Sequence, residues 1–226
     1  ISTAKFTWTS DKTNIIANDG KFNAPDADTD VVITVKVFLD GNTSGTASAT
    51  YTYTVTAKAK GEVVTGGVII SQVYGGGGNS GSTYKNDFIE LYNTTDQDID
   101  ITGWVVFYAS KAGDFKDVGS TTYDSSIVLS GVIKAKSFFL IQANANGGGT
   151  KDLPTPDAIT DIAMAKDSFK VALCNSSDTP TGPDSANIVD FVGVGSAASS
   201  YEGSGAAPTL DNEHAAVRAN LTDTDD

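Results

Sequence analysis

The residue types that usually carry out catalysis are scarce in this chain of 226 residues. It contains one histidine, His214, and one cysteine, Cys174. A serine nucleophile needs a histidine base, so any such triad would have to use His214, and no Gly-x-Ser-x-Gly elbow is present. One histidine and one cysteine cannot build a zinc site of the usual type. We therefore expect His214 at the surface or a strand edge and Cys174 buried and inert.

Three groups of aspartates could hold calcium, a hard cation that takes many oxygen ligands. Asp26, Asp28 and Asp30 alternate directly before a strongly β-forming segment and have the most favourable local spacing. Two further groups lie elsewhere: Asp96, Asp98 and Asp100, and Asp223, Asp225 and Asp226. None has the EF-hand pattern, and solvated acidic loops are the alternative interpretation of all three. We name Asp26, Asp28 and Asp30 as the candidate calcium site and expect no other cofactor.

A glycine-rich segment matches the spacing of a dinucleotide-binding loop. Gly76-x-Gly78-x-x-Gly81 follows a β-forming run, but that chemistry needs a helix N-terminus directly after the glycines. The residues that follow instead lead into another strand-like run. The segment is therefore predicted to be a flexible loop between strands.

Glu90 lies inside the strand-like run from Phe88 to Tyr92. Glu90 has Phe88 and Tyr92 on its own face, so its carboxyl group is expected to be partly buried and could act as an acid or base. A structural role is the simpler interpretation. We expect it to pair with Arg218, the only arginine in the chain.

The stretch from Asn86 to Trp104 organises the rest of the chain. Phe88 to Tyr92 has apolar residues on both faces, which is typical of a strand held between neighbours. Asn93 to Asp96 supplies turn-forming residues, and Ile99 and Ile101 then alternate with aspartates. The pattern predicts a hairpin of two strands joined by a tight polar turn and closed by Trp104.

The remaining apolar runs are short and alternate with period two, so they predict strands rather than helices. No stretch of helix length has apolar residues at i, i+3, i+4 and i+7. The predicted strands are 5–9, 31–39, 49–55, 68–74, 104–108, 127–129, 138–142, 169–174, 188–194 and 215–219.

The order of these motifs resembles the bacterial form of the lamin-tail domain. The motifs are Val68–Gly78, Asn86–Asn93, Ile101–Trp104, Ser137–Ile141, Lys170–Leu173, Ile188–Gly193 and Ala216–Arg218. The resemblance covers roughly residues 66 to 220. It implies an immunoglobulin-like β-sandwich that serves as a binding or spacer module, commonly appended to extracellular nucleases, phosphatases and other hydrolases.

Residues 1–60 resemble the atypical bacterial immunoglobulin-like repeats of secreted multidomain proteins. The matching elements are the Phe6–Trp8 strand, the Asn18–Phe22 turn and the closing strand from Tyr51. The fold class is therefore predicted to be all-β, with two immunoglobulin-like β-sandwich domains in tandem. We expect the first (1–60) to be partial, with an N-terminal strand trimmed away. A linker (61–66), the lamin-tail-like domain (67–221) and the start of a second linker (222–226) follow.

The charge is unevenly distributed. Residues 1–60 contain six lysines and six aspartates, so residues 61–226 carry the whole formal charge of −13. A strongly acidic domain repels phosphate backbones, so we expect no nucleic-acid partner. No apolar run approaches the ~18 residues of a membrane span, so none is expected in this fragment.

These observations predict a non-catalytic accessory, spacer or docking region of a larger secreted or surface-attached bacterial protein, located outside the cell or on its surface. The alternative is a calcium-assisted module that binds carbohydrate or cell-wall polymer, with Tyr84, Tyr123 and Tyr201 as stacking residues. A carboxylate-based hydrolase is a third hypothesis, although no two acids outside the loops are obviously paired. A protein or polysaccharide partner fits either of the first two, and the oligomeric state stays open.

Overall fold

The computed structural model describes residues 4–23, 25, 27–39, 41–57, 67–120 and 125–221. The chain divides into two compact units, residues 1–63 and 64–226, and each is described by itself. Both predicted linkers, 61–66 and 222–226, lie outside the described residues. In the described ranges, no helix has the length and apolar character needed to cross a membrane.

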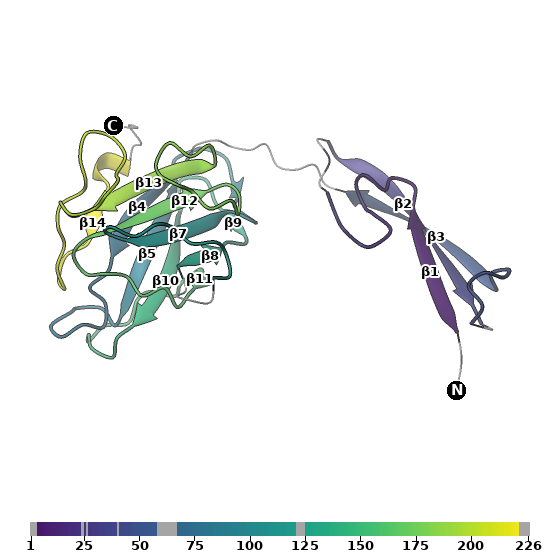
Figure 1. Cartoon of the computed structure of the whole chain (residues 1–226), viewed down its shortest axis with the longest axis horizontal. Helices are drawn as coiled ribbons and strands as arrows, with labels where there is room; N and C mark the ends of the chain where they lie inside the picture. Colours follow the sequence, from purple (N-terminus) through teal and green to yellow (C-terminus); the bar gives the residue numbers. More distant parts are fainter. Residues whose placement is uncertain are drawn as a thin grey trace. The chain divides into compact units, whose positions relative to one another are not determined.

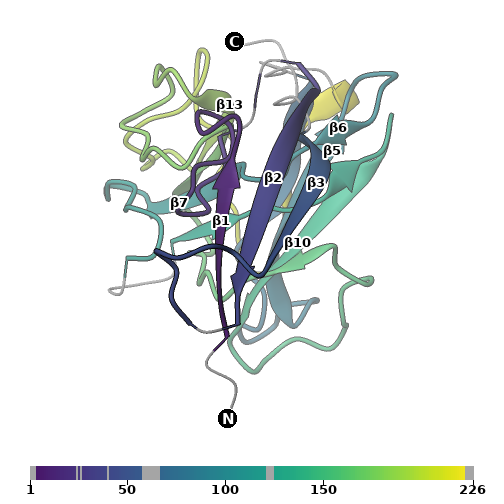
Figure 2. The ribbon, with the colours of Figure 1, turned by 90° about the vertical axis from the view of Figure 1, so that its right-hand side faces the viewer.

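The first unit contains a three-stranded antiparallel sheet (Figures 1 and 2). Its strands are β1 (Lys5–Ser10), β2 (Thr29–Phe38) and β3 (Ala49–Ala57), with β2 in the middle. Directly paired residues share a face of an antiparallel sheet. The register therefore collects the apolar side chains on one side, here called the apolar face: Phe6, Trp8, Val31, Ile33, Val35, Val37, Ala49, Tyr51, Tyr53 and Val55.

The opposite face of this sheet is polar because every second residue of β1 and β3 is a threonine or a lysine. Thr52 and Thr54, for example, pair with Thr34 and Val32 of β2. The buried core of the unit is small. Ile15, Val31 and Ala57 form it at one end of the apolar face.

The second unit is a sandwich of two main sheets (Figure 1). The larger sheet has the order β11-β10-β5-β4-β14. Its strands are β4 (Val68–Tyr74), β5 (Asn86–Asn93), β10 (Phe138–Ala145), β11 (Ala158–Ile159) and β14 (Ala216–Val217). The expected central place of the 88–92 run is confirmed, since β5 is hydrogen-bonded to β10 on one side and β4 on the other.

The smaller sheet has the order β13-β12-β7-β8, and a separate two-stranded ladder joins β6 and β9. Their strands are β6 (Ile99–Asp100), β7 (Val105–Ser110), β8 (Ser126–Val128), β9 (Val132–Ile133), β12 (Phe169–Cys174) and β13 (Ile188–Val194). The only helical element in the described residues is the 3₁₀ turn η1 (Ala219–Leu221). The all-β prediction is confirmed.

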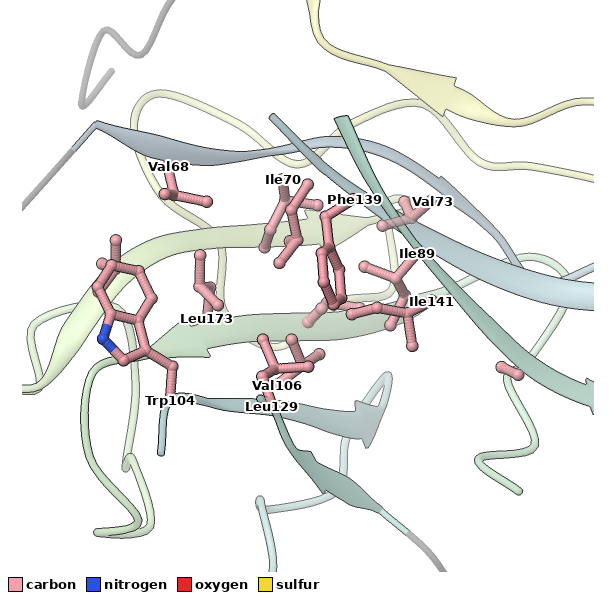
Figure 3. Packing of buried hydrophobic residues seen from close by; sticks show 14 of the residues in the cluster. Val68, Ile70, Val73, Ile89, Trp104, Val106, Leu129, Phe139, Ile141 and Leu173 are labelled. Carbon is pink, nitrogen blue, oxygen red and sulfur yellow. The ribbon is translucent and has the colours of Figure 1, made fainter. Parts of the chain in front are cut away.

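The core of the second unit lies between the two sheets (Figure 3). Ile89 and Ile141 come from the larger sheet, Val106 and Leu173 come from the smaller one, and all four are fully buried. Trp104 lies at one side of this cluster in the view, with Ile89 and Ile141 toward the other. A second cluster, which includes Phe107, Phe115, Cys174 and Phe191, covers the outer face of the smaller sheet. Strand β12 is therefore buried on both sides, which its unbroken burial pattern reflects.

The predicted hairpin at 88–104 is wrong, because its two strands do not pair with each other. β5 lies in the larger sheet, whereas β6 pairs with β9. The side chain of the buried Asn93 explains the divergence. Its amide donates to the carbonyl oxygens of Gln97 (2.7 Å) and Ile133 (3.0 Å), so the turn is fastened to the segment that contains β9.

Candidate functional site

The two sheets of the second unit are joined by a buried ion pair. Asp190 of β13 is fully buried, and its Oδ1 lies 2.5 Å from Nη2 of Arg218, which follows β14. Asp190 Oδ2 accepts a hydrogen bond from the backbone N–H of Ile70, and Arg218 Nε donates to the Ile70 carbonyl (3.3 Å). The pair thus provides hydrogen-bond partners for the N–H and the carbonyl of Ile70 in β4, at the point where β14 ends. Its first role is therefore structural.

The expected partner of Glu90 is therefore corrected. The structure pairs Arg218 with Asp190, while Glu90 Oε1 accepts a hydrogen bond from the Ser71 hydroxyl (2.8 Å). Sequence reasoning identified the arginine but chose the wrong acid. Asp190 lies in a run of apolar residues, and a carboxylate in such a strand needs a buried donor.

A cleft of about 220 Å³ lies beside this ion pair, between β4, β14 and β13. Its charged lining residues are Glu202 and Arg218. Glu202 Oε2 accepts a hydrogen bond from the backbone N–H of Phe191 at the sheet edge (3.3 Å). The cleft is smaller than the roughly 300–1,000 Å³ that small-molecule sites usually occupy, so it offers little room for a ligand.

The glycine-rich segment is packed rather than flexible, which corrects the sequence-based prediction. Gly75 to Gly78 are all buried. A Cβ on Gly75 would lie 2.0 Å from the Ala165 carbonyl oxygen, and one on Gly77 would lie 2.0 Å from the Asn86 carbonyl carbon. The glycines are needed because backbone passes directly against backbone here. A strand, β5, follows this loop, so it has no helix N-terminus to hold a dinucleotide phosphate.

Asp87 anchors this packed loop. Its carboxylate accepts hydrogen bonds from the N–H groups of Gly77 (2.8 Å) and Met164 (2.9 Å), and the residue is fully buried. Burial raises the pKa of Asp87 to about 7, while the two backbone donors act in the opposite direction. Sequence reasoning missed this group. The available signal was a carboxylate at the start of an apolar strand.

Lys170 is a second buried charge that sequence reasoning missed. It is 4% exposed, and its ammonium group donates to the Gly113 carbonyl oxygen (2.6 Å) and the Ser199 hydroxyl (2.8 Å). Burial lowers its pKa, and the nearby Asp114 opposes that shift. It thereby holds two loops against β12. A lysine inside the apolar run 169–174 was the signal that could have indicated it.

The single cysteine and the single histidine are placed as expected. Cys174 is fully buried, and burial raises the pKa of its thiol to about 12, so it is inert. His214 is exposed at the surface, where its Nδ1 lies 2.8 Å from Asp211 Oδ1. That hydrogen bond raises the pKa of His214.

The candidate calcium residues are only partly described. Asp26 lies outside the described residues, as do Asp223, Asp225 and Asp226. Asp30 Oδ1 accepts a hydrogen bond from the Thr56 hydroxyl (2.7 Å), and its backbone carbonyl accepts one from Lys12. The Asp26, Asp28 and Asp30 site stays a prediction. Within the described ranges, no three or more histidine, cysteine or acidic side chains gather closely enough to hold a metal.

The aspartates of the 96–100 turn each have a structural partner. Asp98 forms an ion pair with Lys134 (2.7 Å), and Asp96 forms one with Lys136 (3.4 Å). Asp100 accepts a hydrogen bond from the N–H of Thr102 two residues later (2.8 Å). These contacts fasten the turn and its surroundings, which favours the structural interpretation of this acidic group.

A larger cavity of about 570 Å³ lies where β7 ends. Its lining combines apolar surface, to which Ala109, Gly113 and Ala163 contribute, with the polar residues Tyr108, Ser110, Asp114, Lys116, Ser125, Asn144 and Asp161. Among the described residues, the Ser125 hydroxyl is the only buried side-chain polar atom without a hydrogen-bond partner. Unpaired buried donors are uncommon, and such a group is available to a polar ligand or to water.

The three tyrosines proposed for sugar stacking differ in how far their rings are free to contact a sugar. Tyr84 packs edge-on against Tyr74 and Phe88, with ring centroids 6.2 and 6.0 Å apart, so its ring belongs to an aromatic cluster. Tyr201 is 41% exposed. Tyr123 lies outside the described residues.

Comparison with known proteins identifies the family. No curated protein matches the chain. Among solved structures, the chain is similar to the crystal structure of a DUF4876 family protein from Bacteroides thetaiotaomicron. The sequence identity is 9% and the TM-score 0.33, over 74% of this chain and 65% of that one. The family model of the Lamin Tail Domain matches residues 62–196, which is more than half of the sequence. The chain therefore belongs to the Lamin Tail Domain family.

Proposed function

We propose that this chain is a non-catalytic accessory region of a larger secreted or surface-attached bacterial protein. In this role it spaces or docks a neighbouring extracellular hydrolase such as a nuclease or phosphatase. The observation that carries the proposal is how the buried charged side chains are used. Asp87, Asp190 and Lys170 each bond backbone or side-chain groups of neighbouring elements, which fastens loops and sheets together. Their geometry serves rigidity rather than turnover.

The accessory role predicts that the purified chain has no hydrolytic activity. We expect no turnover of p-nitrophenyl phosphate, p-nitrophenyl glycosides or double-stranded DNA, with or without calcium. Turnover that disappears in Asp87→Asn or in Asp114→Asn would overturn the proposal. The complete reading frame tests whether the chain is attached to a hydrolase, because on this proposal it should encode a hydrolase domain. A frame without one would remove the attached enzyme from the proposal.

A second candidate function, the binding of a small carbohydrate, is favoured by the cavity at the end of β7. Its carboxylates, hydroxyls and amide are the groups that bind sugar hydroxyls, and its volume falls in the range of ligand sites. Among the described residues, the Ser125 hydroxyl has no hydrogen-bond partner, so it could bond a ligand without breaking an existing hydrogen bond. This candidate differs from the calcium-assisted interpretation because calcium has no part in it.

The two functions can be separated with a panel of soluble sugars and insoluble cell wall. We would measure retention of the chain and heats of binding for each ligand, with calcium and with chelator. Binding that is lost in Ser125→Ala but kept in a control variant would support carbohydrate binding in the cavity at the end of β7. Lys170 depends on the Ser199 hydroxyl, so a better control than Ser199→Ala is Ser204→Ala, at an exposed serine outside the cavity lining. Binding should be kept in Ser204→Ala. No retention on any ligand would leave the spacer or protein-docking role.

A further inference from the structure

The apolar face of the first unit is covered at one end and open at the other. At the covered end, Ile15 and Ala57 pack against Val31, and all three are buried. Toward the other end, Phe6 is 71% exposed, Tyr51 52% and Tyr53 56%. A sheet whose apolar face meets water is stable only when another layer covers it. Among the described residues of this unit, Ile15 packs over the covered end, and the aromatic side chains toward the other end stay exposed.

We propose that this face is a self-association interface, on which a second copy of the chain docks through the same surface. Two such sheets would pack face to face at the usual separation of about 10 Å, related by a two-fold axis. Self-association of the first unit is independent of the accessory role proposed above.

Charge favours a second copy as the occupant. No lysine or aspartate of β1, β2 or β3 lies on the apolar face, because Lys5, Lys36 and Asp30 all point to the opposite side. Residues 1–60 as a whole contain equal numbers of lysines and aspartates. Two copies of this face therefore meet without burying an unpaired charge and without net repulsion between the first units.

The shape of the face also suits a copy of itself. The central strand β2 contributes small branched side chains such as Val35 and Val37, which are only partly exposed. The flanking strands contribute Phe6 and Tyr53, which stand out on either side. Rings from the margin of one copy can lie over the valines of the other, as facing sheets in a sandwich interdigitate.

The surface area that two copies would bury against each other indicates a weak dimer. An aromatic side chain buries about 150–250 Å² when it is fully covered, so Phe6, Tyr51 and Tyr53, which are more than half exposed, together offer about 270–450 Å². With Trp8 and the valines, each copy would lose about 400–600 Å², or about 800–1,200 Å² in total. That range spans the roughly 1,000 Å² of a specific interface and is typical of a weak, transient contact. Such a dimer would form at micromolar or higher concentration.

The test is sedimentation velocity on the full 226-residue chain, at concentrations from about 10 to about 500 µM. We expect the weight-average sedimentation coefficient to rise with concentration. Tyr53→Glu should weaken association at least about tenfold, since it replaces an exposed ring of the apolar face by a charge that the contact would bury. Thr52→Glu is the matched control, because residue 52 precedes Tyr53 in β3 and points to the opposite face. Phe6→Ser gives a second variant at a side chain too exposed to hold the fold.

Ionic strength and cross-linking give independent readouts. The acidic second units repel each other, so added salt should strengthen association through this face. A Tyr53→Cys chain should be cross-linked to a dimer by a bis-maleimide of about 10 Å, the spacing of packed sheets, whereas Thr52→Cys should not. A chain that stays monomeric throughout would overturn the proposal. So would equal weakening by Tyr53→Glu and Thr52→Glu, because it would place the contact elsewhere.

Discussion

Arg218 and Asp190 meet at 2.5 Å across the gap between the two sheets of the second unit. Asp190 is fully buried, and the side chain of Arg218 is 20% exposed. Both also bond Ile70, so one ion pair replaces the neighbouring strand that β4 lacks at this residue. Removing one partner would leave the other charge uncompensated and would take a hydrogen-bond partner from one backbone group of Ile70.

We therefore predict that Arg218→Met destabilises the second unit by about 3–5 kcal/mol, the usual cost of leaving one member of a buried pair uncompensated. Urea unfolding followed by Trp104 fluorescence in a Trp8→Phe background would measure it. Lys134→Met is the control, because it breaks an exposed pair with Asp98 and should cost no more than about 1 kcal/mol. If Arg218→Met and Lys134→Met lowered the free energy of unfolding by similar amounts, the burial of an ion pair would not determine its contribution to stability.

Cys174 should report the opening of the second unit. Burial raises the pKa of its thiol to about 12, so almost no thiolate is present at neutral or mildly basic pH. We expect a thiol reagent such as 5,5′-dithiobis(2-nitrobenzoate) to react only as fast as the unit opens. In the Tyr53→Cys variant, the added thiol on the apolar face should react at once. Fast reaction of the unaltered chain in native buffer would contradict the burial.

The stability of the second unit should fall as pH rises toward neutrality. Burial raises the pKa of Asp87 from 3.8 to about 7, so the folded state binds the proton more tightly than the unfolded state does. The free energy of unfolding then decreases between about pH 4 and about pH 7, by at most about 4 kcal/mol, and changes little above that range. Urea midpoints measured across this range would show the decline.

The control for this pH dependence is Asp87→Asn, which removes the titrating group and should flatten the profile. His214 acts in the same direction, because Asp211 raises its pKa and the resulting stabilisation is lost as pH rises through that value. The comparison therefore belongs in a His214→Gln background. An unchanged slope in the Asp87→Asn variant would assign the pH dependence to other groups.

Most of the strands could be predicted from the sequence because their signal is local. The run 188–194 was predicted with the bounds of β13, and 68–74 with those of β4. Alternation of apolar side chains over six or more residues identifies a strand whatever its partner. The two-residue strands β9 and β11 were missed because two residues cannot display a period.

Pairing and charge partners could not be predicted, because they depend on residues far apart in the chain. The chain leaves β5 through a polar turn as a hairpin would, yet Asn93 binds the carbonyl of Ile133, 40 residues away. Glu90 and Asp190 were both available to the single arginine, and only the packing of β13 against β4 brings Asp190 to Arg218. Such choices are made by tertiary contacts rather than by local propensity.

The last prediction concerns Gly77, whose segment was expected to be flexible. A Cβ at this position would lie 2.0 Å from the carbonyl carbon of Asn86 and 2.2 Å from the backbone nitrogen of Asp87. Those atoms belong to β5 and cannot move aside as a side chain end would. We therefore expect Gly77→Ala to destabilise the second unit by at least about 3 kcal/mol, the upper end of typical overpacking costs.

Gly205→Ala is the matched control, because Gly205 is exposed and an added Cβ there would meet nothing within 4 Å. It should leave the urea midpoint nearly unchanged. Gly77→Ala should also steepen the pH dependence assigned to Asp87, since it displaces one of the two N–H groups that hold the pKa of that carboxylate down. If both alanine variants were equally stable, the loop would have the freedom that the sequence first indicated, and close packing could not be the reason for its glycines.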